Sequence, residues 1–352
     1  MRSFLAFAIA CGGCASPPPR AATPVVERVA IVLAERGDQG IHLVGIDEHG
    51  DRQFELVRAA EGMVRDEDPA ISPDGRWVVF ASSRGRDFSE TSLWIAPVQP
   101  DAIATPLTRG VKFLDSHPTW RPDGSGIVFA STRAHGNFDL YELAIDRNGR
   151  AHGEPNRLTS ADGHEVTPSV ARDGTIVYAS VHALADNSVD SHLEARAPDG
   201  TIEKLTDGPG DASPALSPDG TQIAFSRPAE HAGMLDGELW VMPRHGDAAA
   251  LVDVRLTDES GPVWSRDGRF VFATSVLRGS RGNAVFSSVV VVDLTQHPRV
   301  ARMLEDRTGA IQRLSPAIAS IALDARALDG DPEYLSELAR ITAKAAATPA
   351  PP

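Results

Sequence analysis

The chain has 352 residues, enough to bury a sizeable core, and 48 acidic against 34 basic residues give it a formal net charge of −14. A surface that binds nucleic acid is normally basic, so this balance argues against a direct role on DNA or RNA. Gly and Pro are frequent, with 30 and 26 copies, which favours many short strands joined by tight turns.

The N-terminus is similar to a bacterial lipoprotein signal, in which a lipid-modified cysteine becomes the first residue of the mature protein. A basic start and a short apolar run precede the only two cysteines of the chain, Cys11 and Cys14. We expect residues 1–10 to be the signal and Cys11 to carry the lipid, with Cys14 as the alternative; an ordinary cleaved secretory signal is the other interpretation. The apolar run is far shorter than the ~20 residues of a transmembrane helix. Residues 11–27, rich in Ala and Pro, then predict an extended tether.

A repeat fills the chain from about residue 28 to 325. Five segments align, of which "PAISPDGRWVVFASSR" from Pro69 and "PTWRPDGSGIVFASTR" from Pro118 are the clearest. Their Asp-Gly pairs follow one another at steps of 49, 50, 46 and 48 residues and begin at Asp74, Asp123, Asp173, Asp219 and Asp267. Asp-Gly readily adopts the positive φ angles of a two-residue hairpin turn. Each period also holds two further strands, the last ending in Leu-Thr, and four strands in this length predict one propeller blade.

The sixth blade has to be assembled from both ends of the chain. Residues 28–34, 41–46 and 53–58 supply three strands that lack the Pro-Asp-Gly element. The segment from Leu304 aligns weakly with the segment from Leu256 and can supply the fourth. The expected fold is therefore all-β, a six-bladed propeller of four-stranded antiparallel blades, closed by the N- and C-terminal segments so that no free sheet edge remains.

One helix is expected, at the C-terminal end. The sequence of residues 331–346 places Asp331 as N-cap and Pro332 as the first helical residue, ahead of apolar residues near one face. We expect this helix to pack under the propeller, and residues 347–352 to be disordered.

The alternation of proline, Ser-Pro-Asp-Gly, "FAS-x-R", an aromatic strand and Leu-Thr resembles the TolB-type WD-like repeat over about residues 28–320. The resemblance implies a β-propeller of the bacterial periplasm or cell surface that binds other proteins. It covers the propeller alone, because only a short tether precedes the first predicted strand here, whereas TolB carries a further α/β domain.

An acidic residue lies three positions before each repeat proline: Asp66, Asp115, Glu165, Asp211 and Glu259. One hypothesis is a ring of carboxylates on the binding face that attracts a cation or a basic partner, although the weak alignment puts Arg307 at this place in the sixth blade. The other is structural, with each carboxylate accepting backbone N–H groups or pairing with an arginine. Arginines that can reach the same face follow the second strands: Arg36, Arg84, Arg133 and Arg227.

An enzyme is the rival class. His117 and His164 precede repeat prolines, and further histidines follow second strands at His135, His182, His192 and His231. A metal-dependent lyase or hydrolase acting on carbohydrate or peptide would use His117 and His164 at the channel mouth. No tight cluster of histidine with carboxylate is present in the sequence, so we expect no cofactor and no metal. Too few residues follow the propeller for the α/β-hydrolase domain of a serine peptidase, and no Gly-x-Ser-x-Gly motif occurs.

Three long inserts, residues 180–193, 226–239 and 275–288, lie between the second and third strands of consecutive blades. Such loops on a rigid scaffold suit the docking of one partner on one side, and neutral variation in loop length is the other interpretation. We therefore expect a monomeric, non-catalytic scaffold that binds a protein partner in the cell envelope. It would contact the membrane only through its lipid anchor, at the outer membrane and facing the periplasm.

Overall fold

The computed structural model describes residues 29–47, 53–110, 112–134, 136–185, 188–231, 234–246, 248–252, 258–278, 284–295, 301–303 and 313–318. Within these ranges all regular structure is β-strand, and no helix there is long and apolar enough to cross a membrane. Several predictions concern residues outside them: the signal with Cys11 and Cys14, the tether, the helix at 331–346 and the tail.

The strand bounds, in chain order, are β1 Val29–Gly37, β2 Gly40–Asp47, β3 Gln53–Glu55, β4 Val64–Ile71, β5 Trp77–Ser82, β6 Ser92–Pro97, β7 Thr105–Pro106, β8 Asp115–Trp120, β9 Gly126–Ser131, β10 Asp139–Ile145, β11 Ala151–Arg157, β12 His164–Val170, β13 Ile176–Ala183, β14 Val189–Arg196, β15 Ile202–Lys204, β16 Ala212–Leu216, β17 Gln222–His231, β18 Met234–Pro243, β19 Ala250–Leu251, β20 Glu259–Trp264, β21 Phe270–Arg278, β22 Ala284–Asp293, β23 Ala301–Met303 and β24 Arg313–Ile318.

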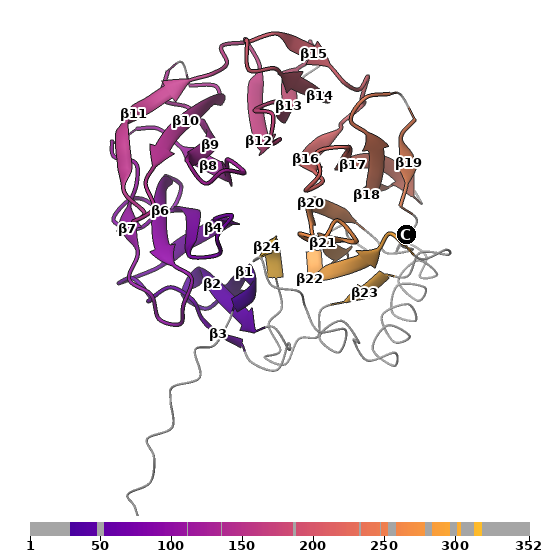
Figure 1. Ribbon diagram of the computed structural model, residues 1–352. Coiled ribbons are helices and arrows are strands. Elements are labelled where there is room, and N and C mark those ends of the chain that lie inside the picture. The colour runs from indigo at the N-terminus through magenta and orange to yellow at the C-terminus, as the bar shows by residue number, and fades with distance from the viewer. Residues whose placement is uncertain are drawn as a thin grey trace, which may run out of the picture.

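The sheets stand around a centre as the blades of a propeller do (Figure 1). Four of them are four-stranded and consist of β8–β11, β12–β15, β16–β19 and β20–β23. Strands β4, β8, β12, β16, β20 and β24 lie toward the centre, and short strands such as β7 and β15 lie at the rim. Within each of the four sheets neighbouring strands pair antiparallel, as the repeat predicted.

The prediction of six separate four-stranded sheets is wrong among the described residues. The remaining strands form one eight-stranded sheet, in which the antiparallel groups β24-β1-β2-β3 and β4-β5-β6-β7 are joined by a short parallel pairing of β2 with β4. Only Gly40 with Val64 and Ile41 with Arg65 take part in that pairing. Gly40 makes it possible, because a Cβ there would lie 1.9 Å from the Val64 carbonyl oxygen.

The ring closes between its two ends, as predicted. Strand β24, from the C-terminal part of the chain, pairs antiparallel with the N-terminal strand β1, with Ile31 opposite Ile318. This pairing removes the free edge that an open propeller would leave.

Each innermost strand contains the same backbone irregularity. The residue before the repeat proline has a positive φ of 48 to 59°, and the strand register shifts there. The six residues are Asp68, His117, Thr167, Ser213, Gly261 and Ser315. Because Ser315-Pro316 shares this feature, β24 is the sixth copy of the inner strand, although it lacks the sequence signature that follows the proline elsewhere.

The Asp-Gly segment is a turn, but a longer one than predicted. The N–H of Gly75 donates to the Ser72 carbonyl at 2.8 Å, and the N–H of Ser72 donates to the Trp77 carbonyl at 2.7 Å. Four residues therefore separate the paired positions, and of the Asp-Gly pair only the glycine has positive φ, 74° at Gly75. The Asp74 carboxylate accepts from the Ser72 hydroxyl and the Arg76 N–H. The aspartate is thus a local acceptor that holds the turn.

Replacing Gly75 by valine should lower the free energy of unfolding by more than ~1 kcal/mol, because a β-branched residue is strained at positive φ. Chemical denaturation measures the change. The control is Gly37→Ala, at an exposed position where an added Cβ would meet no other atom within 4 Å. A loss at Gly75→Val no larger than at the control would contradict the turn assignment.

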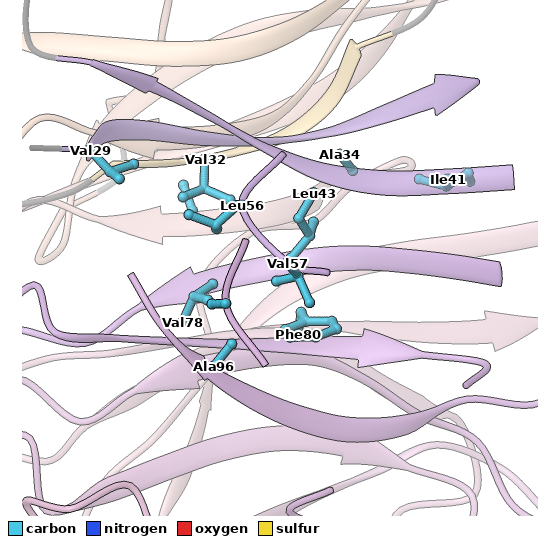
Figure 2. Close-up of a cluster of buried hydrophobic side chains, with 12 residues drawn as sticks. Val29, Val32, Ala34, Ile41, Leu43, Leu56, Val57, Val78, Phe80 and Ala96 are labelled. Carbon is cyan, nitrogen blue, oxygen red and sulfur yellow. The ribbon is translucent and has the colours of Figure 1, made fainter. Parts of the chain in front are cut away.

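The hydrophobic core lies between neighbouring blades. Figure 2 shows one such cluster, where Val32 and Leu43 from β1 and β2 face Val78 and Phe80 from β5. Further clusters of the same kind fill the spaces between the other blades. Continuous apolar runs such as "WVVFAS" supply both faces of a blade, and the corresponding strand β9 is buried along its whole length.

Candidate functional site

The five predicted carboxylates lie on or directly before the innermost strands β4, β8, β12, β16 and β20, and all are buried, with at most 3% of the residue exposed. Asp66, Asp115, Glu165, Asp211 and Glu259 are therefore not exposed in the structure, and the hypothesis that they attract a cation or a basic partner stays a prediction. The alternative, that each pairs with an arginine, is confirmed for the three aspartates only.

Asp66 shows the complete pairing of a repeat carboxylate with its arginine. Both of its oxygens accept from the Arg84 guanidinium, and one also accepts from the Ser82 hydroxyl at 2.5 Å. Only 9% of the Arg84 side chain is exposed, and Asp66 is closed off from solvent. Burial of a charge is tolerable in this geometry because the pair is bidentate and its oxygens are hydrogen-bonded.

The next two aspartates repeat the arrangement. Arg133 donates to Asp115 at 2.8 Å, and the hydroxyl of Thr108, from the Leu-Thr end of the preceding blade, donates to the same carboxylate at 2.6 Å. Arg227 donates to both oxygens of Asp211, at 2.6 and 2.8 Å. Asp115 therefore connects its blade to the preceding one, Asp211 pairs within its own blade, and both arginines are structural residues.

Aromatic rings hold the arginines in place. The Arg133 guanidinium lies over Phe129 and Tyr141 at 5.2 and 5.0 Å from the ring centroids. That of Arg227 lies over Trp240 at 4.9 Å. The side chains of Arg133 and Arg227 remain 17% and 23% exposed, so this position touches solvent.

In the first blade, the residues at the positions of the carboxylate and of its arginine differ from the predicted ones. Its register puts Arg313, rather than Arg307, at the position of the carboxylates, opposite Glu35 of β1. Arg307 lies outside the described residues. Arg36 is exposed on β1 and does not occupy the position of Arg84, since Glu35 corresponds to Ser82 in the register.

Among the described residues, neither glutamate has an arginine as its partner. Glu165 lies opposite Ser180 in the register, so the place of the arginine, two residues later, is taken by His182. Glu259 lies opposite Ser275, and there the place is taken by Leu277. The Ser275 hydroxyl gives Glu259 only a long hydrogen bond of 3.4 Å. The longer side chain thus occurs where the positive partner is missing.

Burial sets the charge of both glutamates. Loss of solvation, reinforced by Asp139 and Glu194, raises the pKa of Glu165 to about 7. Loss of solvation, reinforced by Asp258 and Asp236, raises the pKa of Glu259 to about 8. Near neutral pH, a large fraction of each group therefore carries its proton.

A polar cluster surrounds Glu165. The Tyr178 hydroxyl donates to Glu194 at 2.7 Å, and His192 contacts the other oxygen of Glu194 at 3.2 Å. His192 stacks on His182, with ring centroids 5.7 Å apart and planes 12° from parallel. No other blade in the described part of the chain places two carboxylates and two imidazoles together at this point.

His117 and His164, the residues proposed for a metal enzyme, each have separate partners. His117 contacts Ser116 at 2.9 Å, and its backbone N–H donates to Asp68. His164 accepts from the Phe138 N–H at 3.1 Å. Within the described ranges, no group of three His, Cys, Asp or Glu is arranged to hold a metal ion. His135 lies outside these ranges.

The long inserts are extended hairpins rather than loops. Strands β13 and β14 have eight residues each, β17 and β18 ten each, and β21 and β22 nine and ten, whereas β5, β6 and β9 have six. Exposed apolar residues occur on two of these extensions: Leu184 and Val189 beside the first turn, and Leu235 beside the second. Strand pairing makes these projections rigid enough to present a surface.

Sequence reasoning missed Tyr178, Glu194 and Asp139. Glu194 and Asp139 belong to third strands, whose sequences differ from blade to blade, whereas Tyr178 occupies the regular aromatic position of the second strand and was taken for a core residue. The available signal was the exception at His182, where "FASSR" becomes "YASVH" and the positive charge of the repeat is replaced.

A protein-family model, the TolB beta propeller domain, matches residues 86–268, just over half of the 352 residues. The chain belongs to the TolB β-propeller family. No curated protein is a significant match. The assignment accounts for the repeated inner-strand and turn geometry of the blades.

Solved structures with the same fold include TolB proteins. A putative TolB from Agrobacterium tumefaciens is 17% identical, with a TM-score of 0.54, over 83% of this chain and 93% of that one. TolB from Acinetobacter baumannii is also 17% identical, with a TM-score of 0.60, over 83% of this chain and 66% of the other. Hydrazine synthase of Kuenenia stuttgartiensis reaches a TM-score of 0.63 at 13% identity, over 87% of this chain and 51% of that one. At these identities the likeness shows the fold alone.

Proposed function

We propose that this TolB-like propeller is a non-catalytic, monomeric scaffold that binds a protein partner in the bacterial cell envelope. The observation that supports it most directly is the projection of three consecutive blades as extended hairpins, with Leu184, Val189 and Leu235 exposed on two of them. Rigid projections with apolar side chains on one part of a rim suit a single protein contact. The carboxylate–arginine pairs, which are buried, belong to the scaffold.

The anchoring part of the proposal rests on the N-terminal sequence. Cys11, or alternatively Cys14, would carry the lipid, and the tether to residue 27 would hold the propeller off the outer membrane on its periplasmic side. Mass spectrometry of the mature N-terminus tests this part separately from partner binding.

We also infer that the eight-stranded sheet acts as two blades, which makes six in the ring. Each of its halves is antiparallel and has its own innermost strand, β24 or β4. The two-residue parallel pairing between the halves is brief beside the antiparallel ladders within them.

Photo-crosslinking in native membranes tests partner binding. A photoreactive residue at Val189 or Leu235 is expected to capture one protein species, and the same residue at Ile202, an exposed apolar position on the rim strand β15, is not. Equal capture at all three positions, or none, would contradict docking on the hairpins.

A further inference from the structure

The blade of β12–β15 departs from the repeat at three positions that meet in space. Glu165 replaces an aspartate, and His182 replaces the arginine. Glu194 stands opposite Tyr178 in the register, at the place where neighbouring blades have an aromatic residue. Those aromatic residues are Trp94, Tyr141 and Trp240. All three changes affect one feature of the repeat: the carboxylate, the arginine that pairs with it, and the aromatic ring that stacks on the guanidinium.

The result is a buried group of carboxyls at which the guanidinium of the repeat is missing; the nearby Arg157 pairs with Asp139. Both carboxylate oxygens of Glu165 are buried without a hydrogen-bond partner among the described residues, although Thr159 and the Ala161 N–H are close enough to lower its pKa. One oxygen of Asp139 is in the same situation, and the other accepts from Arg157 at 2.8 Å. Buried carboxylates without partners are costly, so such a centre calls for a ligand that supplies N–H groups and positive charge.

We propose that this blade receives a guanidinium group, an arginine side chain of the bound protein partner, with Glu165 and Glu194 as its acceptors. The inference rests on the proposed function, because it names the chemistry of the segment that the scaffold would hold. The same chain supplies the precedent, since Arg133 and Arg227 place a guanidinium at the equivalent position of their own blades. A planar, bidentate donor is the group that the repeat geometry fits.

Access to the site is through the two imidazoles. His192 contacts Glu194 and stacks on His182, and both imidazoles are partly exposed, just as Arg133 and Arg227 are in their blades. On binding, the His182 ring turns toward solvent and gives up its 3.0 Å contact with the Ser180 hydroxyl. Imidazole faces can then take the place of the aromatic rings that stack on arginine elsewhere. The net charge of −14 favours a basic partner over an acidic one.

The probe for this site is N-acetylarginine amide, compared with N-acetylcitrulline amide, which has nearly the same shape and no charge. In titrations of the full chain followed by NMR, the arginine probe should bind in the millimolar range and the citrulline probe about tenfold or more weakly. Glu165→Gln should weaken the arginine probe by a similar factor, and Glu203→Gln, at an exposed site on β15, should not. Equal affinities for both probes, or an unchanged affinity in Glu165→Gln that melts as a folded protein, would overturn the proposal.

A second variant tests whether the site accepts a guanidinium that belongs to the chain itself. His182→Arg supplies the missing guanidinium within the chain, and it should abolish binding of the arginine probe and raise the melting temperature. Retained binding together with a lower melting temperature would show that the position cannot accept a guanidinium, and would also overturn the proposal.

Proton release is the readout that a structural role would not produce. Because Glu165 has a pKa of about 7, the guanidinium must displace its proton, and affinity should fall as the pH decreases below that value. The other titratable or charged groups around the centre are Asp139, Arg157, His164, Tyr178, His182, His192, Glu194 and Arg196. Calorimetry in two buffers of different ionisation enthalpy measures the released proton; no release in the neutral range contradicts the assignment to Glu165.

The two proposals can fail independently. If the photoreactive residue at Val189 captures a partner but the arginine and citrulline probes bind equally well, the guanidinium site is rejected and the scaffold function stands. If the arginine probe binds more tightly than the citrulline probe but no partner is captured, the proposed docking on the hairpins is rejected and the guanidinium site stands.

Discussion

Replacing Arg84 by methionine is expected to lower the free energy of unfolding by about 3–5 kcal/mol, because the substitution leaves a buried carboxylate uncompensated. Asp66 has 1% of its side chain exposed and receives two hydrogen bonds from that guanidinium. Urea denaturation at neutral pH, with a two-state fit checked by two probes, measures the change.

The control for this experiment is Arg58→Met. Arg58 also pairs with an aspartate, Asp101, at 2.8 Å, but the two side chains are 59% and 64% exposed. Solvent screening makes the contribution of such an exposed pair to stability small. The double variant Arg84→Met/Asp66→Leu should recover most of the loss, since it removes both buried charges. Similar losses for Arg84→Met and Arg58→Met would show that the buried pair does not stabilise the joint between blades.

Replacing Glu259 by glutamine is expected to stabilise the protein in alkaline solution by about 3–5 kcal/mol and to have little effect in acid. The folded state raises the pKa of Glu259 from its ordinary value of 4.5 to about 8, chiefly by burial. The folded protein therefore holds this proton more tightly than the unfolded chain. The stability that the proton confers is complete below the unfolded pKa and is lost as the pH rises to about 8. Glutamine has nearly the same shape and cannot lose a proton.

Denaturation curves measured at several pH values test this prediction. The difference in the free energy of unfolding between Glu259→Gln and the parent should grow by ~1.4 kcal/mol for each pH unit between the two pKa values and then level off. Glu203→Gln, on the exposed strand β15, should give a difference that stays constant. Parallel curves for the parent and Glu259→Gln would mean that this carboxyl is ionised in the folded protein throughout the range.

The positions at which one blade departs from the repeat were as informative as the positions that all blades share. The five carboxylates were equivalent in the sequence, and the aligned arginines accompany only the three aspartates. In the structure this division separates the three aspartates, whose charge is neutralised by arginine, from Glu165 and Glu259, whose pKa is raised by burial. A glutamate opposite a missing arginine was visible in the alignment of the repeats, but its consequence depends on burial, which that alignment does not show.

The predicted number of sheets was wrong because of one short contact between two strands. The sequence has no Pro-Asp-Gly element in the first 58 residues, and the three strands expected there do form as β1, β2 and β3. Their merging with the next blade depends on the close approach of Gly40 to Val64, a tertiary contact between the first residues of β2 and β4. No local pattern encodes such a contact.

The sequence by itself determined the antiparallel four-stranded blade and its repetition, because the turn residues and the apolar runs are local and recur five times. It also determined that the ring closes through its two ends, since an unpaired sheet edge would remain otherwise. Only the tertiary structure decided which charged residues are buried, that the inserts are rigid hairpins, and that Glu165, Glu194, His182 and His192 meet. Charge and hydrogen bonding act through space, and in a propeller the residues that meet between blades are far apart along the chain.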